Sequence, residues 1–119
     1  MENRCESYQA CYWLVEDTVW IRMSFINIAL EDLDDARKLY QSEFISGVIK
    51  SQPGYRFHYW LESTERPGDV ISLTAWNTQS DGEAYERGGV YSELGSKLRQ
   101  WFHTERVLRC YEVREVADL

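Results

Sequence analysis

Asn27 and His58 are two side chains of this sequence whose types could take part in chemistry. Asn27 lies among apolar neighbours on one face of an expected strand, and a buried amide needs hydrogen-bond partners. It would either complete an internal network, which is the commoner case, or face a cavity and hold a carbonyl or enolate oxygen of a substrate. His58 could act as a general base near pH 7. However, it shares its strand face with Arg56, Trp60 and Glu62, which is typical of a solvated face.

Aromatic residues are the other candidates, and they make up 14% of the sequence. Their rings could line a pocket for a flat aromatic ligand. Equally, they could form the core of a barrel between two subunits. The residues concerned are Phe25, Tyr59, Trp60, Trp76, Tyr85 and Tyr91. The sequence leaves both interpretations open.

The sequence favours neither a metal site nor a phosphate loop. Its two histidines, three cysteines and many carboxylates show no close pairing of metal ligands. The pair Gly88-Gly89 is not part of a nucleotide-binding glycine pattern. We therefore expect no metal and no cofactor.

Length and charge limit the class of protein. A chain of 119 residues predicts one domain. The formal net charge of −7 argues against a nucleic-acid partner, which needs a basic surface. The apolar runs are too short for a membrane span, and charges among the first twenty residues argue against a secretory signal. Three cysteines without a CxxC pattern favour reduced thiols and a cytoplasmic protein.

Hydrophobic periodicity predicts the elements that must position these side chains. Strands are expected over 18–30, 54–62, 70–76 and 105–116, with a turn at 63–68 inside the hairpin. A helix is expected over 31–50, where Leu33, Ala36, Tyr40, Phe44 and Val48 form one stripe. A second helix begins at a capping box with Ser80 as the N-cap, and it is interrupted at Gly88-Gly89. Residues 1–17 are either an arm or an extra strand, and 18–117 form the single domain.

The resulting order, β-α-β-β-α-β, predicts an α+β, ferredoxin-like fold with an antiparallel four-stranded sheet. Two helices can cover only one face of such a sheet. The first strand carries apolar residues on both faces, so it needs cover on both sides. A second copy packed on the open face would provide that cover. We therefore expect a homodimer, a dimeric α+β barrel.

From Trp20 to about Val116 the sequence resembles the antibiotic biosynthesis monooxygenase family of the dimeric α+β barrel group. The resemblance lies in order and spacing: a first strand ending near Asn27, a helix leading to Pro53-Gly54-Tyr55, and the strand ending Leu73-Thr74-Ala75-Trp76. A polar link and a helix with Tyr85 and Tyr91 follow. Proteins of this kind are cofactor-independent oxygenases acting on polycyclic aromatic compounds, haem-degrading enzymes, or small proteins without a demonstrated reaction.

The haem-degrading branch is disfavoured by two positions. Its members use an Asn on the first strand, and Asn27 matches this residue. A Trp of the second helix would fall at position 85 and a His at position 95, but these are Tyr85 and Gly95. Without that His, the haem iron lacks its protein ligand.

The resemblance therefore implies a cofactor-independent monooxygenase-like protein acting on a small aromatic or quinol-type compound. Asn27 would orient a substrate oxygen, Tyr85 or Tyr91 would donate a hydrogen bond, and Trp76 would support the wall. Phe25, His58 and Tyr91 would contact the ligand. The alternatives are a non-catalytic small-molecule-binding or stress-response protein on the same scaffold, and a structural homo-oligomer with a filled core.

Overall fold

The structure is a computed structural model that describes residues 19–115. The predicted arm or extra strand at 1–17 lies outside the described residues. In chain order the elements are β1 (Trp20–Asn27), α2 (Leu30–Gln41), a π-helical turn (Glu43–Gly47), α3 (Val48–Lys50), β2 (Tyr55–Glu62), β3 (Asp69–Trp76), α4 (Gln79–Arg87), α5 (Gly89–Arg99) and β4 (Val107–Glu112). Within this part of the chain, no helix is long and apolar enough to cross a membrane.

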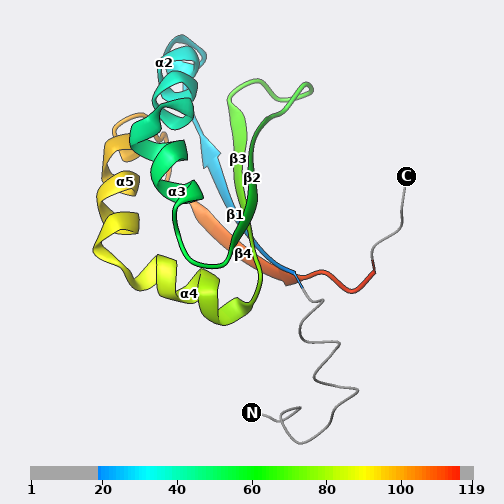
Figure 1. Ribbon diagram of the computed structural model, residues 1–119. Coiled ribbons are helices and arrows are strands. Elements are labelled where there is room, and N and C mark those ends of the chain that lie inside the picture. The colour runs from blue at the N-terminus through cyan, green and yellow to red at the C-terminus, as the bar shows by residue number, and fades with distance from the viewer. Residues whose placement is uncertain (1–18, 116–119) are drawn as a thin grey trace, which may run out of the picture.

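The four strands form one antiparallel sheet in the order β2-β3-β1-β4. This is the strand order of the ferredoxin-like fold, so the predicted fold is confirmed. All the helices lie on one side of the sheet, and the other side is open (Figure 1). Since side chains alternate along a strand, every second residue of β1 and β3 faces the helices.

The main core lies between the sheet and the helices. Its largest fully buried side chains are Trp76, Ile28, Ile45 and Val70. Helices α4 and α5 meet at Gly88, whose extended backbone ends the first helix before the second begins at Gly89. The predicted interruption at this glycine pair is therefore confirmed.

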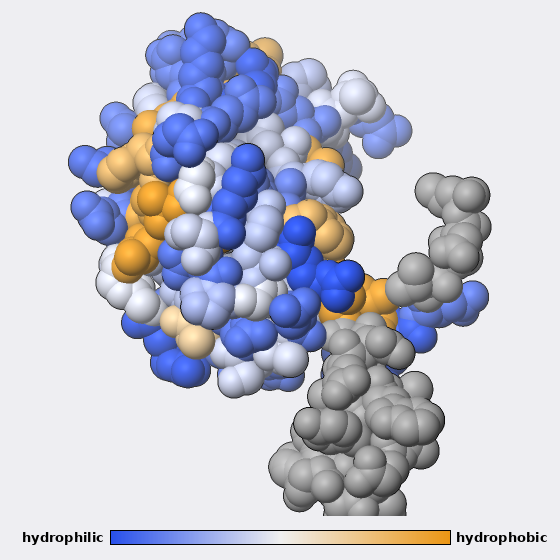
Figure 2. All heavy atoms as spheres, viewed as in Figure 1, coloured by the Kyte–Doolittle hydropathy of each residue, from blue (hydrophilic) through white to orange (hydrophobic). Residues whose placement is uncertain are grey.

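The open face of the sheet carries a smaller apolar cluster around Ile21, Leu73 and Ala75. Its outer side chains remain exposed, between 36% for Phe25 and 54% for Tyr59. Orange atoms beside the sheet, opposite the helices, mark part of this apolar surface in Figure 2. A surface of this kind is costly in water.

The long helix predicted over 31–50 is not continuous. Helix α2 ends at Gln41, Ser42 takes an extended backbone, and a π-helical turn follows. The break changes which side chains point inward. Ile45 is 1% exposed, whereas Phe44, which we placed on the buried stripe, is 42% exposed. The α-helical spacing was therefore the wrong guide beyond Gln41.

The N-cap of α4 is Thr78, two residues before the predicted Ser80. The hydroxyl of Thr78 accepts a hydrogen bond of 3.0 Å from the backbone N–H of Asp81. Both Thr78-x-x-Asp81 and Ser80-x-x-Glu83 fit the sequence pattern of a helix start. The earlier one forms because β3 ends at Trp76, which leaves only Asn77 between the strand and the cap.

Candidate functional site

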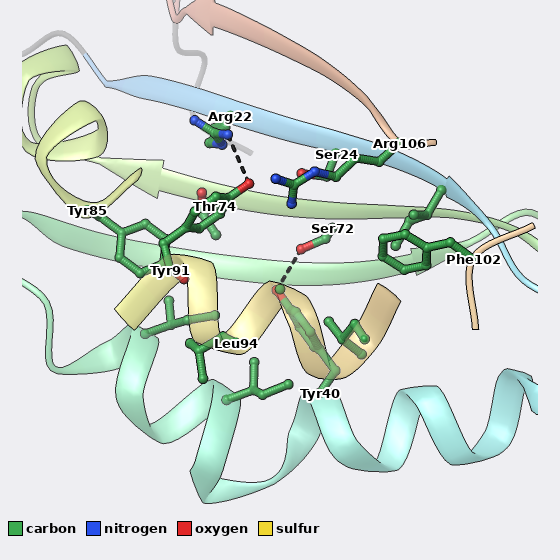
Figure 3. A pocket seen from close by; sticks show the side chains of 15 residues that line it. Arg22, Ser24, Tyr40, Ser72, Thr74, Tyr85, Tyr91, Leu94, Phe102 and Arg106 are labelled. Atoms are coloured by element: carbon green, nitrogen blue, oxygen red, sulfur yellow. Dashed lines mark hydrogen bonds between the residues drawn. The ribbon is translucent and has the colours of Figure 1, made fainter. Parts of the chain in front are cut away.

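A cavity of about 60 Å³ lies between the covered face of the sheet and the helices (Figure 3). Strands β1 and β3 supply its floor, α2, the π-helical turn, α3, α4 and α5 its roof, and the segment before β4 one end. The lining residues are Arg22, Ser24, Ile26, Tyr40, Ile45, Ile49, Ser72, Thr74, Tyr85, Tyr91, Leu94, Gly95, Leu98, Phe102 and Arg106. One wall is therefore apolar, and the rest carries hydroxyl and guanidinium groups.

Arg22 is a charged residue in the core, with only 3% of its side chain exposed. It forms an ion pair with Glu86, and its Nη2 donates a hydrogen bond of 3.0 Å to the hydroxyl of Tyr91. Burial opposes its charge, but the contacts with Glu86 and Tyr91 outweigh this, so the pKa of Arg22 is raised. The hydrogen bond from Arg22 also lowers the pKa of Glu86. Arg22 is therefore a fixed cation.

One nitrogen atom of Arg22 makes no hydrogen bond within the described part of the chain. Its Nε is buried and has no hydrogen-bond partner among the described residues. An unsatisfied buried donor costs about 1–3 kcal/mol. Such groups call for an explanation, and a water or a ligand is one of the usual ones.

Two guanidinium groups lie close to the ring of Tyr91. The Cζ atoms of Arg22 and Arg106 are each 5.0 Å from the centroid of its ring. In Figure 3 both arginines reach toward it from the side of the sheet. Because its hydroxyl oxygen already accepts from Arg22, its proton remains free to donate. A hydroxyl that accepts a charge-assisted hydrogen bond becomes a stronger donor.

Tyr85 supplies a second hydroxyl to the cavity. Its ring stacks on Trp76 with centroids 5.0 Å apart, and it meets the edge of Tyr91 at 5.3 Å. Burial raises the pKa of Tyr85 far above its usual range, so its hydroxyl stays protonated. It makes no hydrogen bond to another residue of the described part of the chain. Trp76 does not line the cavity but holds Tyr85 in place, and its Nε1 donates to Thr74.

Tyr40 of α2 and Ser72 of β3 connect the helices above the cavity to the sheet below it. The Ser72 hydroxyl donates to the Tyr40 hydroxyl at 3.0 Å, and burial raises the pKa of Tyr40 to about 12. Tyr40 is therefore a neutral hydroxyl at physiological pH, like Tyr85. The cavity thus combines neutral hydroxyl groups with two permanent cations, which suits a ligand oxygen that carries or develops negative charge.

The structure separates the predicted site residues into three places. Tyr85 and Tyr91 line the cavity, with Trp76 behind them. Asn27 and Phe25 lie on the open face, where they line a different hollow of about 720 Å³. The Asn27 amide donates a hydrogen bond of 2.6 Å to Asp69. Asn27 therefore does not reach the cavity that holds the two tyrosines.

His58 lies in a third place, below the break in the first helix. Its Nε2 is 3.1 Å from the Ser46 hydroxyl and its Nδ1 is 2.8 Å from the Tyr55 hydroxyl. The solvated strand face that we expected here is wrong, because this face of β2 lies under the helices. A register shift between Tyr55 and Phe57 also brings Tyr55 to the side of His58. Burial lowers the pKa of His58.

The sequence analysis missed Arg22 and Arg106, which dominate the cavity. Their 84-residue separation hides the pairing, since only the fold brings β1 beside the start of β4. One signal was present: Arg22 interrupts the apolar face that contains Trp20 and Ile26. A charge at an inward position of a strand indicates a buried, compensated group.

Gly95 stands where the haem-degrading branch would have its His. A Cβ atom at this position would lie 3.1 Å from Nη2 of Arg99 and 3.7 Å from Nη1 of Arg106. The space beside Gly95 is thus next to guanidinium groups, which are permanent cations and cannot bind iron. No cluster of three potential metal ligands occurs between residues 19 and 115.

The fold and the cavity place the chain among α+β proteins with one layer of helices on a four-stranded antiparallel sheet. No family model matches the sequence, and no curated protein matches it. Solved structures do match, and several are named as candidate antibiotic biosynthesis monooxygenases. The resemblance to this family is therefore confirmed at the level of the fold.

Two of these structures illustrate the match. The protein from Caulobacter crescentus is 10% identical, with a TM-score of 0.71, covering 90% of this chain and 100% of its own. The protein from Deinococcus radiodurans is 15% identical, with a TM-score of 0.70, covering 84% of this chain and 97% of its own. At such identities the likeness establishes the fold alone.

Proposed function

We propose that the protein is a monooxygenase-like enzyme that oxidises a small phenolic or quinol-type compound bound in the cavity. The observation that carries the proposal is the pair of hydroxyl groups, Tyr85 and Tyr91, in front of the buried cation Arg22. Structural neighbours named as candidate monooxygenases support this choice.

Arg22 and Tyr91 would favour the anion of the substrate. An opposite charge within a few ångströms lowers the pKa of an acidic group by about 1–3 units. A phenol with a pKa near 10 would then be partly ionised at neutral pH. The hydroxyls of Tyr85 and Tyr91 would hold the resulting oxyanion in place.

The electron-rich anion would react directly with dioxygen. For a quinol, one ring carbon takes one oxygen atom and the ring is oxidised to a hydroxyquinone. The second oxygen atom leaves as water with two hydrogens of the quinol. The substrate supplies all the electrons, so the reaction is balanced without an external reductant.

The cavity volume restricts the substrate. About 60 Å³ is room for roughly four to six water-sized atoms. The enclosed part of the ligand is therefore a single ring at most, and any further ring would have to lie in the mouth. This favours a smaller compound than the polycyclic substrates that the family resemblance implies.

Oxygen uptake with a panel of single-ring quinols tests this proposal. Tyr85→Phe and Tyr91→Phe each remove one donor from the cavity, and we expect each to lower kcat by about 10²-fold. Tyr59→Phe is the matched control, because Tyr59 is 54% exposed on the open face, and its rate should stay within twofold. Equal rates in all three variants would contradict the assignment of the cavity.

Asn27→Ala distinguishes catalysis in the cavity from the catalytic role predicted for Asn27. If catalysis occurs in the cavity, this variant keeps its rate, since Asn27 lines the other hollow. A large loss of kcat with an unchanged fold would instead move the reaction to the open face. Binding without oxygen uptake by any variant would favour the non-catalytic small-molecule-binding alternative.

We also propose that two copies pack their open faces together as a homodimer. The exposed apolar side chains of that face, among them Phe25, Tyr59 and Leu61, support this, because an isologous contact would remove them from water. Light scattering tests it directly, and a monomer at micromolar concentration would contradict it.

A further inference from the structure

A basic hollow adjoins the cavity and shares part of its wall. The hollow measures about 440 Å³ and is lined by Arg99, Phe102, His103, Thr104, Glu105 and Arg106. Phe102 and Arg106 also line the cavity. These two side chains border both spaces, so the hollow lies directly beside the cavity, and we call it the mouth.

Two arginines, Arg99 and Arg106, line this mouth in a protein of net charge −7, and Arg22 lines the cavity beside it. Arg106 and Arg22 contact the same tyrosine ring, so their Cζ atoms are at most twice 5.0 Å apart. Arg99 and Arg106 both lie beside Gly95. Like charges gathered in this way repel one another, and the repulsion is strongest where water is excluded.

The local carboxylates compensate only part of this charge. Glu86 pairs with Arg22, and Glu105 lines the outer hollow. Neither Arg99 nor Arg106 forms an ion pair with a residue in the 19–115 range. Arg106 is half-buried and its guanidinium group rests on the Tyr91 ring, where it is held but not neutralised. Within residues 19–115, Arg106 thus has no ion-pair partner of its own, although its charge helps to lower the pKa of Glu86, after the larger effect of the hydrogen bond from Arg22.

Gly95 makes room for this arrangement. It faces the cavity from α5, and a side chain there would press on Arg99, whose Nη2 would be 3.1 Å from the added Cβ. Glycine in a helix interior costs about 0.5–1 kcal/mol relative to alanine. The missing side chain therefore leaves room for the Arg99 guanidinium group to lie near that of Arg106.

We propose that the ligand of this cavity is a single-ring aromatic carboxylic acid whose carboxylate is held at the mouth by Arg106, with Arg99 beside it. The ring enters the cavity and its phenolic oxygen meets Tyr85 and Tyr91 in front of Arg22. A guanidinium fork fits a carboxylate. The inference rests on the proposed function for the binding of the phenolic ring, and it adds the binding of the carboxylate.

Calorimetric titration with 4-hydroxybenzoate and its neutral analogue 4-hydroxybenzamide tests the acid end. Wild-type protein should bind the acid about 10- to 100-fold more tightly than the amide, as expected for a hydrogen-bonded charge. Arg106→Gln should lower the affinity for the acid to the affinity for the amide, and it should change the affinity for the amide by less than twofold. Arg106→Lys keeps the charge without the fork and should give an intermediate loss. Arg66→Gln removes the same charge from the exposed hairpin turn and should change the affinity for neither ligand.

Equal affinity for acid and amide, equal weakening of both by Arg106→Gln, or no binding of either at millimolar concentration would overturn the inference. Circular dichroism melting of each variant confirms that the fold is kept. Oxygen uptake separates the two proposals. Acid-selective binding without oxygen uptake supports the carboxylate site and refutes the oxygenase. Uptake with neutral quinols and no preference for acids supports the oxygenase and refutes the carboxylate site.

Discussion

Gly82 lies where helix α4 packs directly on two tryptophan rings. A Cβ atom at this position would come well under 3.0 Å from two ring carbons of Trp20 and 3.1 Å from Cδ1 of Trp76. Trp20 is 5% exposed and Trp76 is fully buried. Neither ring can therefore move outward to make room, and Gly82→Ala must shift the helix or the rings.

Two opposing terms set the size of the effect. Replacing a helical glycine by alanine gains about 0.5–1 kcal/mol, whereas overpacking a buried contact costs about 1–3 kcal/mol. We expect Gly82→Ala to lower the free energy of unfolding by about 0.5–2 kcal/mol, since the overpacking cost exceeds the propensity gain. At about 4 °C per kcal/mol, Tm should fall by about 2–8 °C.

Gly89→Ala is the matched control. It makes the same chemical change near the start of α5, where no atom lies within 4 Å of the added Cβ. We expect it to be neutral or to stabilise by up to about 1 kcal/mol. Urea unfolding followed by far-UV circular dichroism gives both values. If the two variants change stability equally, the close packing of α4 on the tryptophans is not what requires Gly82.

The same pair tests how the site is supported. Trp76 stacks on Tyr85 at 5.0 Å, so a displaced Trp76 would tilt a wall of the cavity. Gly82→Ala should therefore weaken ligand binding as well as stability, and Gly89→Ala should not. Weaker stability with unchanged binding would indicate that Tyr85 is held by its other neighbours.

Three further predictions concern pH, capping and assembly. Burial lowers the pKa of His58 below its ordinary 6.5. The stability that neutral His58 contributes is therefore fully present above pH 6.5 and is lost as the pH falls through the folded pKa. His58→Gln should make the urea midpoint vary less between pH 7.5 and 5. Thr78→Ala should cost about 1 kcal/mol in the same assay, whereas Ser80→Ala should stay within about 0.5 kcal/mol; the reverse order would place the cap at Ser80. The charge introduced by Tyr59→Glu should convert a dimer to a monomer by light scattering, and an unaltered dimer would place the interface elsewhere.

The order of elements could be predicted from sequence because each is marked locally. Alternating apolar residues define the strands, and Pro53-Gly54 and Gly88-Gly89 end helical segments by backbone conformation alone. Gly54 indeed has a positive φ of 81°. The order of six elements then leaves few topologies, and the ferredoxin-like one is among them.

Details that depend on one inserted residue could not be predicted in this way. The π-helical turn shifts the buried side chain from Phe44 to Ile45, and the register shift in β2 brings Tyr55 and His58 to one face. Each violates strict periodicity by one position. Such a slip changes which face a side chain occupies, and only packing against the rest of the fold selects it.

The cavity is encoded by residues that break the pattern of the face they occupy. On β1 and β3 the positions that face the helices include Arg22, Ser24, Ser72 and Thr74, although a core that only stabilises the fold would place apolar side chains there. Departures from local rules are expected at functional sites, where stability is exchanged for chemistry. A charged or hydroxyl residue at an inward strand position, once the fold is known, is therefore a better guide to this site than Asn27 or His58. That reasoning also explains why Arg106 escaped notice: it precedes β4 rather than interrupting it, so no broken pattern marks it.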